Sequence, residues 1–196
     1  MTPRTLRLAA ALAAPLLALS SCSAQPTQPT PSAVASASGG SDVLERLGLA
    51  DADAVTLVNT LDRSTDARPL DLKASVKANE VVLTDGAGER ILPLPADKFY
   101  LSIAPYRETT HECFAHSLSG CQGEQVNKQV KLTITDQQGK KLVDKQTSTA
   151  TNGFVGVWLP RDISGTVTAT IDGRTGTVPF ATTADSPTCL TTLQLR

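Results

Sequence analysis

The chain has 196 residues, with 18 basic and 19 acidic residues and a formal net charge of −1. It contains neither the basic patch that nucleic-acid binding requires nor a long acidic tail, so no nucleic-acid partner is expected. Only 4% of the residues are aromatic, so a folded core has to rest mainly on valine, leucine and isoleucine.

The first 21 residues have the build of a secretory signal peptide. Arg4 and Arg7 form a short positive region, and the apolar run over residues 8–19 is shorter than the roughly 20 residues that a spanning helix needs. The run ends in LSSC, which resembles the bacterial lipobox, whose cysteine receives a diacylglycerol and becomes the new N-terminus. We therefore predict a lipoprotein signal over residues 1–21 and lipidation of Cys22. An ordinary signal peptide followed by a chance cysteine is the alternative.

Residues 22–41 are predicted to follow as a lipidated cysteine and a flexible linker. The stretch is rich in serine, proline, alanine, threonine and glycine and has no charged residue, a composition that cannot bury a core. No later stretch is apolar for long enough to span a bilayer. The sequence thus predicts an exported protein, held by its lipid at the outer face of the cytoplasmic membrane or in the periplasm.

Residues 42–105 are predicted to form a small α+β N-terminal domain. Apolar residues recur at helical spacing over residues 51–63, and a shorter helix is expected over residues 41–49. Two apolar runs around a glycine-containing turn predict a hairpin over residues 81–94, and residues 99–103 are a third strand candidate. Helices and strands therefore mix in this part of the chain.

Residues 106–196 are predicted to form a metal-binding loop followed by a β-sandwich. Apolar and polar residues alternate in short runs, and turn signals such as Asp172-Gly173 separate them every 8–12 residues. The expected strands cover residues 130–134, 141–145, 155–159, 167–171, 178–180 and 189–195. This pattern is typical of an antiparallel sandwich of immunoglobulin-like type.

Chemistry-bearing residues gather in the loop HECFAHSLSGC, residues 111–121. This window holds both histidines of the chain and two of its four cysteines. Cys113, His116 and Cys121 have the spacing C-x2-H-x4-C, and His111 lies two residues before Cys113. Cys189 opens the last predicted strand, whose start can lie at the same edge of a sandwich as the loop. Three thiols can then converge.

Four interpretations of this cluster remain open from the residues alone. A Cys113–Cys121 disulfide would be purely structural. Structural zinc normally takes four ligands in paired spacings, and a thiol–disulfide oxidoreductase usually shows C-x-x-C. A Cu(I) site fits because soft thiolates select Cu(I), with imidazole as an auxiliary ligand. Met1 is the single methionine and leaves with the signal, so any copper site has to be a thiolate site.

Three long motifs resemble a known family. They are HECFAHSLSGCQGE, NGFVGVWLPRDISGTVTATIDGRTGTVPF and DSPTCLTTLQL, and together they are similar to CueP, a family of exported bacterial copper-binding proteins linked to copper resistance. The resemblance implies that Cys113, Cys121 and Cys189 carry the copper function, and His116 falls within the same motif. It also implies a β-sandwich C-terminal domain and an N-terminal domain that can serve in dimerisation.

We therefore predict an extracytoplasmic copper-binding lipoprotein that sequesters Cu(I) through Cys113, Cys121 and Cys189. His116 is expected to act as an auxiliary ligand or as a hydrogen-bond donor behind the ligands. One alternative is reduction of Cu(II) by the protein's own thiols, which would make the protein a thiol-coupled copper reductase and require a thiol–disulfide reductase as partner. The other is a structural module with one disulfide. Sequestration alone is not catalysis, and no catalytic residue is predicted.

Overall fold

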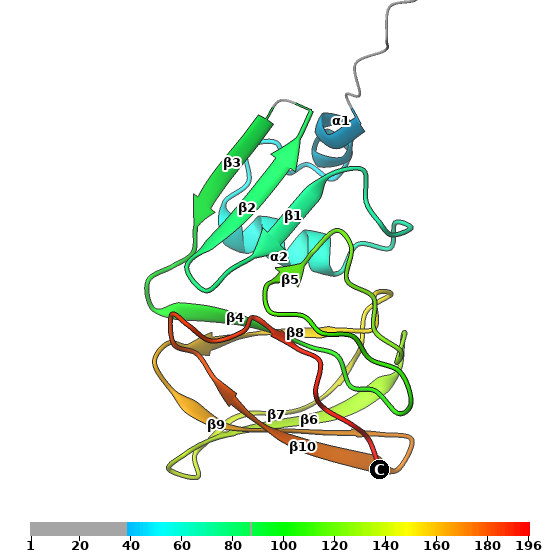
Figure 1. Ribbon diagram of the computed structural model, residues 1–196, viewed down its shortest axis with the longest axis vertical. Helices are drawn as coiled ribbons and strands as arrows, with labels where there is room; N and C mark the ends of the chain where they lie inside the picture. Colours follow the sequence, from blue (N-terminus) through cyan, green and yellow to red (C-terminus); the bar gives the residue numbers. More distant parts are fainter. Residues whose placement is uncertain (1–38, 87) are drawn as a thin grey trace, which may run out of the picture. The chain divides into compact units, whose positions relative to one another are not determined.

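Strands make up most of the regular structure, and two short helices lie near its N-terminal end (Figure 1). The computed structural model describes residues 39–86 and 88–196. The predicted signal peptide, the predicted lipidation site Cys22 and the linker up to residue 38 lie outside the described residues. Within the described part of the chain, no helix is long and apolar enough to cross a membrane. The prediction of a β-rich chain with few helices is confirmed.

The two helices are α1 (Gly39–Arg46) and α2 (Ala54–Asp62), and both overlap the predicted ranges. Helix α2 begins after Asp53, whose carboxylate accepts a hydrogen bond of 2.9 Å from the backbone N of Thr56. Its apolar residues Leu57, Val58 and Leu61 are buried against the first sheet. Its last residue, Asp62, is also buried, which places a carboxylate inside the molecule.

The first sheet has the strand order β3-β2-β1-β5, and all its neighbours are antiparallel. Its strands are β1 (Lys73–Val76), β2 (Glu80–Asp85), β3 (Gly88–Pro93) and β5 (His116–Ser117). The predicted hairpin corresponds to β2 and β3. The short strand β5 comes from the cysteine-bearing loop, where His116 lies opposite Val76. One part of that loop is therefore fixed to the N-terminal sheet.

Two further sheets share the larger hydrophobic core. Their strand orders are β10-β9-β6-β7 and β11-β4-β8, antiparallel except for the parallel pair β11 and β4. The strands are β4 (Lys98–Ile103), β6 (Gln129–Asp136), β7 (Lys141–Ser148), β8 (Val155–Pro160), β9 (Ser164–Ile171), β10 (Arg174–Ala181) and β11 (Cys189–Leu190). In β6, every second residue is buried as the alternation predicts. The immunoglobulin-like arrangement stays a prediction.

Strand β4 lies between two cores. Its residues Phe99, Leu101 and Ile103 belong to the larger core, whereas Tyr100 packs into the core under α2. Residues 99–103 were predicted as a third strand within residues 42–105, and β4 pairs with β8 and β11, which both lie beyond that range. Burial on both faces explains these pairings, because a strand covered on two sides needs partners in the middle of the molecule. The predicted domain boundary at residue 105 stays a prediction, and β4 and β5 each pair with strands across it.

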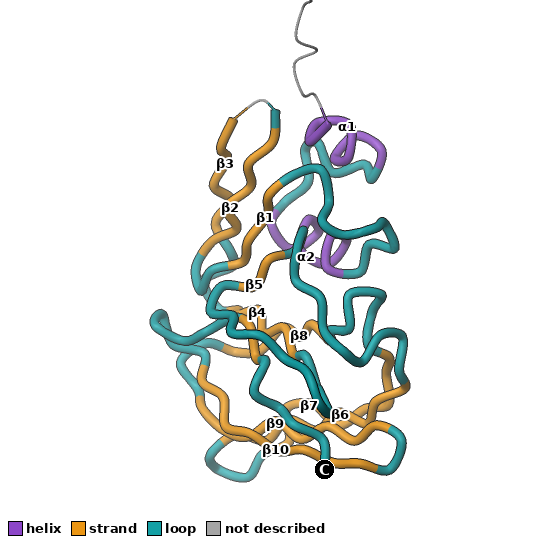
Figure 2. Tube along the Cα trace, turned by 45° about the vertical axis from the view of Figure 1, so that its right-hand side comes forward, coloured by secondary structure: helices purple, strands orange, loops and turns teal. Residues whose placement is uncertain are grey.

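The segment between β4 and β6 is mostly loop, and β5 is its one strand in the described chain (Figure 2). This segment carries both histidines and two of the cysteines. It contacts the first sheet through β5, and it contacts the other end of the chain through the residues before β11. The fold thus brings the segment and the start of β11 together.

Candidate metal centre

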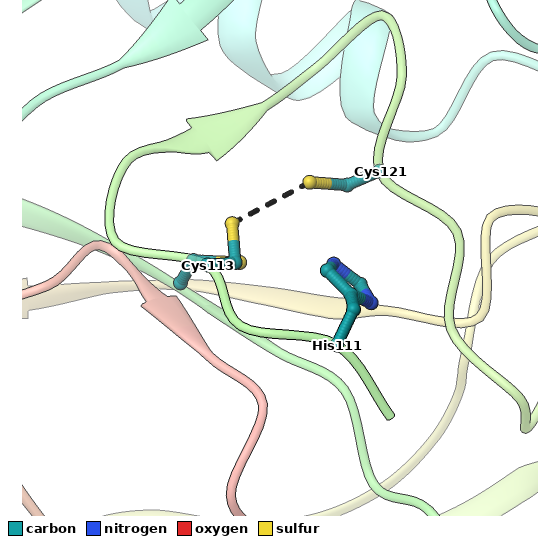
Figure 3. A group of neighbouring side chains, drawn as sticks. His111, Cys113 and Cys121 are labelled. Atoms are coloured by element: carbon teal, nitrogen blue, oxygen red, sulfur yellow. Dashed lines mark hydrogen bonds between the residues drawn. The ribbon is translucent and has the colours of Figure 1, made fainter. Parts of the chain in front are cut away.

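Four side chains form a group with the spacing of a metal site. His111, Cys113, Cys121 and Cys189 each offer one ligand atom, and these atoms all lie within 4.8 Å of one another. Figure 3 shows Cys113 and Cys121 directed at each other, with His111 beside them. Three of these residues come from the loop between β4 and β6, and Cys189 comes from the first position of β11. The structure therefore brings the three predicted cysteines together.

A tight turn places Cys121. Its backbone N donates to the carbonyl of Ser117 at 3.1 Å, and the backbone N of Ser117 donates to Cys121 Sγ at 3.4 Å. The backbone N of Gly120 donates to the Ser117 hydroxyl at 3.0 Å. Because Ser117 belongs to β5, the sheet fixes the turn, and the turn fixes the sulfur.

Thr188 joins the loop to the start of β11. Its backbone N donates to the carbonyl of Phe114 at 2.9 Å, and its hydroxyl accepts from the backbone N of His116 at 3.0 Å. Phe114 follows Cys113 directly, and Thr188 precedes Cys189 directly. These two hydrogen bonds therefore set the separation of two cysteines that lie far apart in the sequence.

The cysteine sulfurs are close but not bonded. Cys113 Sγ lies 3.6 Å from Cys121 Sγ, and all three cysteines are free thiols. Cys189 is 3% exposed, whereas Cys113 and Cys121 are half-buried. Ala104 and Phe154 form an apolar wall against the three thiols. The group thus has a buried end at Cys189 and an open end toward the loop.

His116 lies behind the cysteines, outside the group of four. Its imidazole is fully buried, with Nε2 at 2.7 Å from Asp62 Oδ1 and Nδ1 at 3.6 Å from Cys189 Sγ. The ring also contacts Phe154 at a centroid distance of 4.7 Å. Of the two predicted roles for His116, this position favours the hydrogen-bonded one. Direct ligation by His116 stays a prediction.

The histidine within the group of four ligand atoms is His111. It is exposed and lies at the open end of the group. Shallow depressions of about 370 Å³ and about 330 Å³ flank it, one bordered by Cys113 and the other by Cys121. The sequence carried a usable signal, because His111 lies only two residues before Cys113.

Asp62 is the functional candidate that our sequence reasoning missed. Its carboxylate accepts from Tyr100 Oη at 2.5 Å and from Asn152 Nδ2 at 2.8 Å, in addition to its contact with His116. A signal was present here too, since Asp62 lies four residues after Val58 on the apolar face of α2. An acidic residue at such a position needs a buried partner.

Charge pairing sets the pKa values of Asp62 and His116. Burial alone raises the pKa of Asp62, but the charge of His116 and hydrogen bonds from His116, Tyr100 and Asn152 bring it below its ordinary value. Burial alone lowers the pKa of His116, but the charge and hydrogen bond of Asp62 raise it well above its ordinary value. The pair is therefore favoured as imidazolium and carboxylate, which places positive charge beside the thiols.

The three thiols hold their protons unequally. Hydrogen bonds with Cys113 and Cys189 lower the pKa of Cys121, and His116 contributes in the same direction. The pKa of Cys189 is raised by its contacts with Cys113 and Cys121 and by burial. The thiolate is the form that binds metal. The cluster therefore offers its first thiolate at Cys121, on the open side.

Glu124 holds the backbone that leads into His111. Its Oε2 accepts from the backbone N of Arg107 at 2.7 Å, of Glu108 at 3.0 Å and of Thr109 at 3.2 Å. Burial alone raises the pKa of Glu124, but these three hydrogen bonds together bring it below the ordinary value. The open end of the site is therefore ordered by one carboxylate on a loop.

Comparisons with known proteins point in one direction. The family model described as "Periplasmic copper-binding protein CueP" matches residues 56–194. The crystal structure of S.CueP matches with a TM-score of 0.75 and 47% sequence identity, over 80% of this chain and 96% of that chain. A search of curated proteins gives no match.

Proposed function

The chain belongs to the CueP family of periplasmic copper-binding proteins, and from this premise we propose that it sequesters Cu(I) through the thiolates of Cys113, Cys121 and Cys189. The family supports copper as the bound metal and export from the cytoplasm as the location. Sequestration of Cu(I) outside the cytoplasm would protect the cell against copper stress. The finer features proposed below are the ligand set, the oxidation state and the lipid anchor.

The observation that carries this proposal is the convergence of three sulfurs and one imidazole within 4.8 Å. Metal–sulfur bonds are about 2.3 Å long in zinc proteins, so two ligands of one ion lie less than about 4.6 Å apart. Small side-chain adjustments therefore suffice to surround one ion. Soft thiolates select Cu(I) over harder ions, and the apolar wall at Phe154 keeps water away from the buried side.

The test is a titration of the reduced full chain with Cu(I) against a competing chelator, in the absence of oxygen. One Cu(I) per chain is expected. Loss of a residue that hydrogen-bonds to a metal ligand costs about 10–100-fold in metal affinity. The single variants Cys113→Ser, Cys121→Ser and Cys189→Ser are each expected to weaken Cu(I) binding by more than this, because a hydroxyl is a poor ligand for Cu(I). Unchanged affinity in Cys189→Ser would contradict the three-thiolate site and leave a two-cysteine loop.

The side chains of this group could also bind zinc, so zinc has to be tested as a competing metal. Three cysteines and one histidine also occur in structural zinc sites. The same titration in the presence of equimolar Zn²⁺ is expected to leave the Cu(I) affinity unchanged, because soft thiolate ligands select Cu(I). Displacement of Cu(I) by Zn²⁺ would contradict a copper-selective site and indicate that the group binds zinc.

The 3.6 Å separation of Cys113 Sγ and Cys121 Sγ favours a second candidate function, the reduction of Cu(II). Two thiols that become a disulfide release two protons and two electrons, which convert two Cu(II) to two Cu(I). A thiol–disulfide reductase would then have to reset the bridge. The reduced protein is expected to yield about two Cu(I) per chain from added Cu(II), trapped anaerobically with a chromogenic chelator. Cu(I) without thiol loss would reject this mechanism.

Lipidation of Cys22 is part of the same proposal and rests on the LSSC motif. A lipid at this position would hold the protein at a membrane surface, with residues 23–38, which precede α1, as the tether. Cys22→Ala is expected to release the protein from the membrane fraction without changing the Cu(I) affinity of the folded part. Unchanged fractionation with membranes would show that the motif is not used.

Dimerisation through the N-terminal part is the remaining proposal. It is supported by β3, an edge strand of the first sheet whose residue Ile91 is 57% exposed. Ile91→Lys is expected to shift the protein to a monomer in sedimentation experiments. A parent that is already monomeric at all concentrations would contradict it.

A further inference from the structure

A buried carboxylate lies directly behind the thiols. Asp62 is 2% exposed, and four polar groups meet at its two oxygens. Oδ1 receives His116 Nε2 at 2.7 Å and Asn152 Nδ2 at 2.8 Å. Oδ2 receives Tyr100 Oη at 2.5 Å and Ser102 Oγ at 3.3 Å. A charge removed from water is tolerated only when it is paired and fully hydrogen-bonded, and this carboxylate meets both conditions.

The acceptor character of Asp62 determines the orientation of His116. An ionised carboxylate can only accept hydrogen bonds, so His116 Nε2 must carry a proton and donate it. The other ring nitrogen, Nδ1, then faces Cys189 Sγ at 3.6 Å. This assignment is the same whether the ring carries one proton or two. Phe154 packs against the ring, with the two ring centroids 4.7 Å apart.

We propose that Asp62 is a positioning residue of the metal centre, which holds the Nε2 proton of His116 and thereby aims Nδ1 at the sulfur of Cys189. Nδ1 then keeps this buried sulfur directed toward Cys113 and Cys121, where Cu(I) would lie. Carboxylates that orient histidines in this way are a general device of metal sites. The inference rests on the proposed binding of Cu(I) by the three cysteines.

Gly156 and Arg68 also help to fix the surroundings of the Asp62 carboxylate. Gly156 on β8 packs so closely that an added Cβ would overlap the hydroxyl of Tyr100 and come within 2.9 Å of Asp62 Oδ2. Arg68 links the end of α2 to the cysteine loop. Its guanidinium donates to the carbonyl of Leu61 at 2.9 Å and to that of Leu118, in the loop, at 3.4 Å. The end of α2 and the loop are thus held together from two sides.

A purely structural role for Asp62 is the alternative, in which the ion pair only joins α2 to β5. The two roles differ in what a neutral substitution does. Asp62→Asn keeps the shape but can present an amide N–H to His116, so the ring loses its fixed acceptor. A structural role predicts lower stability with unchanged copper binding, whereas a positioning role predicts a change in the ring and in copper binding together.

The first measurement uses the parent full chain, reduced and free of copper. Long-range ¹H–¹⁵N correlation of the imidazole is expected to show a proton on His116 Nε2. In Asp62→Asn, the His116 signals are expected to shift to a mixture of tautomers. An unprotonated Nε2 in the parent overturns the proposal without any variant and without copper, so this outcome is independent of the proposed function.

The second measurement is the Cu(I) affinity of the same chains by chelator competition. Asp62→Asn is expected to weaken binding about tenfold, at the lower end of the range for partners of metal-site histidines. His116→Ala and the double variant Asp62→Asn/His116→Ala are expected to bind equally, because Asp62 acts through His116. An affinity of Asp62→Asn equal to that of the parent overturns the proposal. A parent chain that binds no Cu(I) would instead refute the proposed function.

Asp53→Ala is the matched control at the other end of the same helix. Asp53 caps α2 through Thr56 and has no contact with the cysteine group, so its loss is expected to lower the melting temperature while leaving the Cu(I) affinity and the His116 signals at parental values. If Asp53→Ala weakens Cu(I) binding as much as Asp62→Asn, the effect of Asp62 is structural and the proposal fails.

Discussion

The two ends of the cysteine group are built in different ways. At the buried end, Cys189 and His116 are held by a strand, by a charged pair with Asp62 and by an apolar wall. At the open end, His111 is exposed and depends on a loop that Glu124 orders through backbone hydrogen bonds. The buried end therefore sets the geometry of the site, and the open end provides its access. Substitutions at the two ends should consequently change different properties.

The largest contrast is expected between two glycine substitutions, one at each end. Gly156→Ala places a methyl group on the Tyr100 hydroxyl and against Asp62, so the buried network has to shift. We expect a loss of about 3 kcal/mol in the free energy of unfolding, as for severe overpacking. Gly120→Ala, in the turn before Cys121, is the control, because the added Cβ meets the side chain of Ser117, with the hydroxyl at 3.2 Å, and no buried network.

Urea unfolding of the two copper-free variants measures the difference. Gly120→Ala is expected to stay within about 0.5 kcal/mol of the parent, as surface substitutions usually do. Equal losses in both variants would show that the buried end is no more tightly packed than the open end.

Thiol reactivity should separate the ends next. Cys121 is half-buried with a lowered pKa, whereas Cys189 is 3% exposed with a raised pKa. Because the thiolate is the nucleophile, alkylation of the reduced copper-free protein is expected at Cys121 first and at Cys189 last. Peptide mapping by mass spectrometry at successive times gives the order. Early modification of Cys189 would contradict its place at the buried end.

The sequence predicted those parts of the molecule that depend on local patterns. The alternation in residues 130–134 predicted β6. The cysteine spacing and the family motifs predicted that the three thiols lie close together. The partners of β4 were not predictable in this way, because a strand's neighbours depend on non-local packing. Asp62 was missed for the same reason, since its partner His116 lies 54 residues away.

The roles of the two histidines show the limit of spacing most clearly. His111 and His116 both lie within three residues of Cys113, so their distance along the chain does not separate a ligand from a supporting residue. The pairing of His116 with Val76 on β1 turns its ring toward Asp62, and only the fold contains that information. His111 has no such pairing and stays at the open end.

A smaller effect is expected from Glu124 at the open end. Glu124→Gln removes the charge that accepts three backbone hydrogen bonds, and the loop before His111 should become less ordered. With about 1 kcal/mol for a net hydrogen-bond contribution, dissociation of Cu(I) should become about fivefold faster. Stopped-flow transfer of Cu(I) to a chelator measures the rate.

Lowering the pH should remove the same Glu124 hydrogen bonds in the parent protein. The pKa of folded Glu124 lies below its ordinary value of 4.5, so its hydrogen bonds are fully present above that value and are lost as the pH falls through the folded pKa. The backbone amide signals of residues 107–109 are therefore expected to shift only below about pH 4.5. Glu124→Gln should show the shifted signals already at neutral pH. Identical spectra of the variant and the parent at neutral pH would exclude this role of Glu124.

The smallest equilibrium effect is expected from His111→Ala. The exposed imidazole contributes one nitrogen to a group in which three sulfurs already satisfy Cu(I), and thiolates are the softer ligands. We expect the Cu(I) affinity to fall by about threefold, or about 0.7 kcal/mol, much less than for Cys189→Ser. Because His111 lies between the two depressions that lead to Cys113 and Cys121, the rate of Cu(I) capture should fall more than the affinity does. Capture rates and competition titrations on the same samples measure the two quantities. If His111→Ala weakens binding as much as Cys189→Ser, the open end sets the affinity as well as the access, and the division between the two ends is wrong.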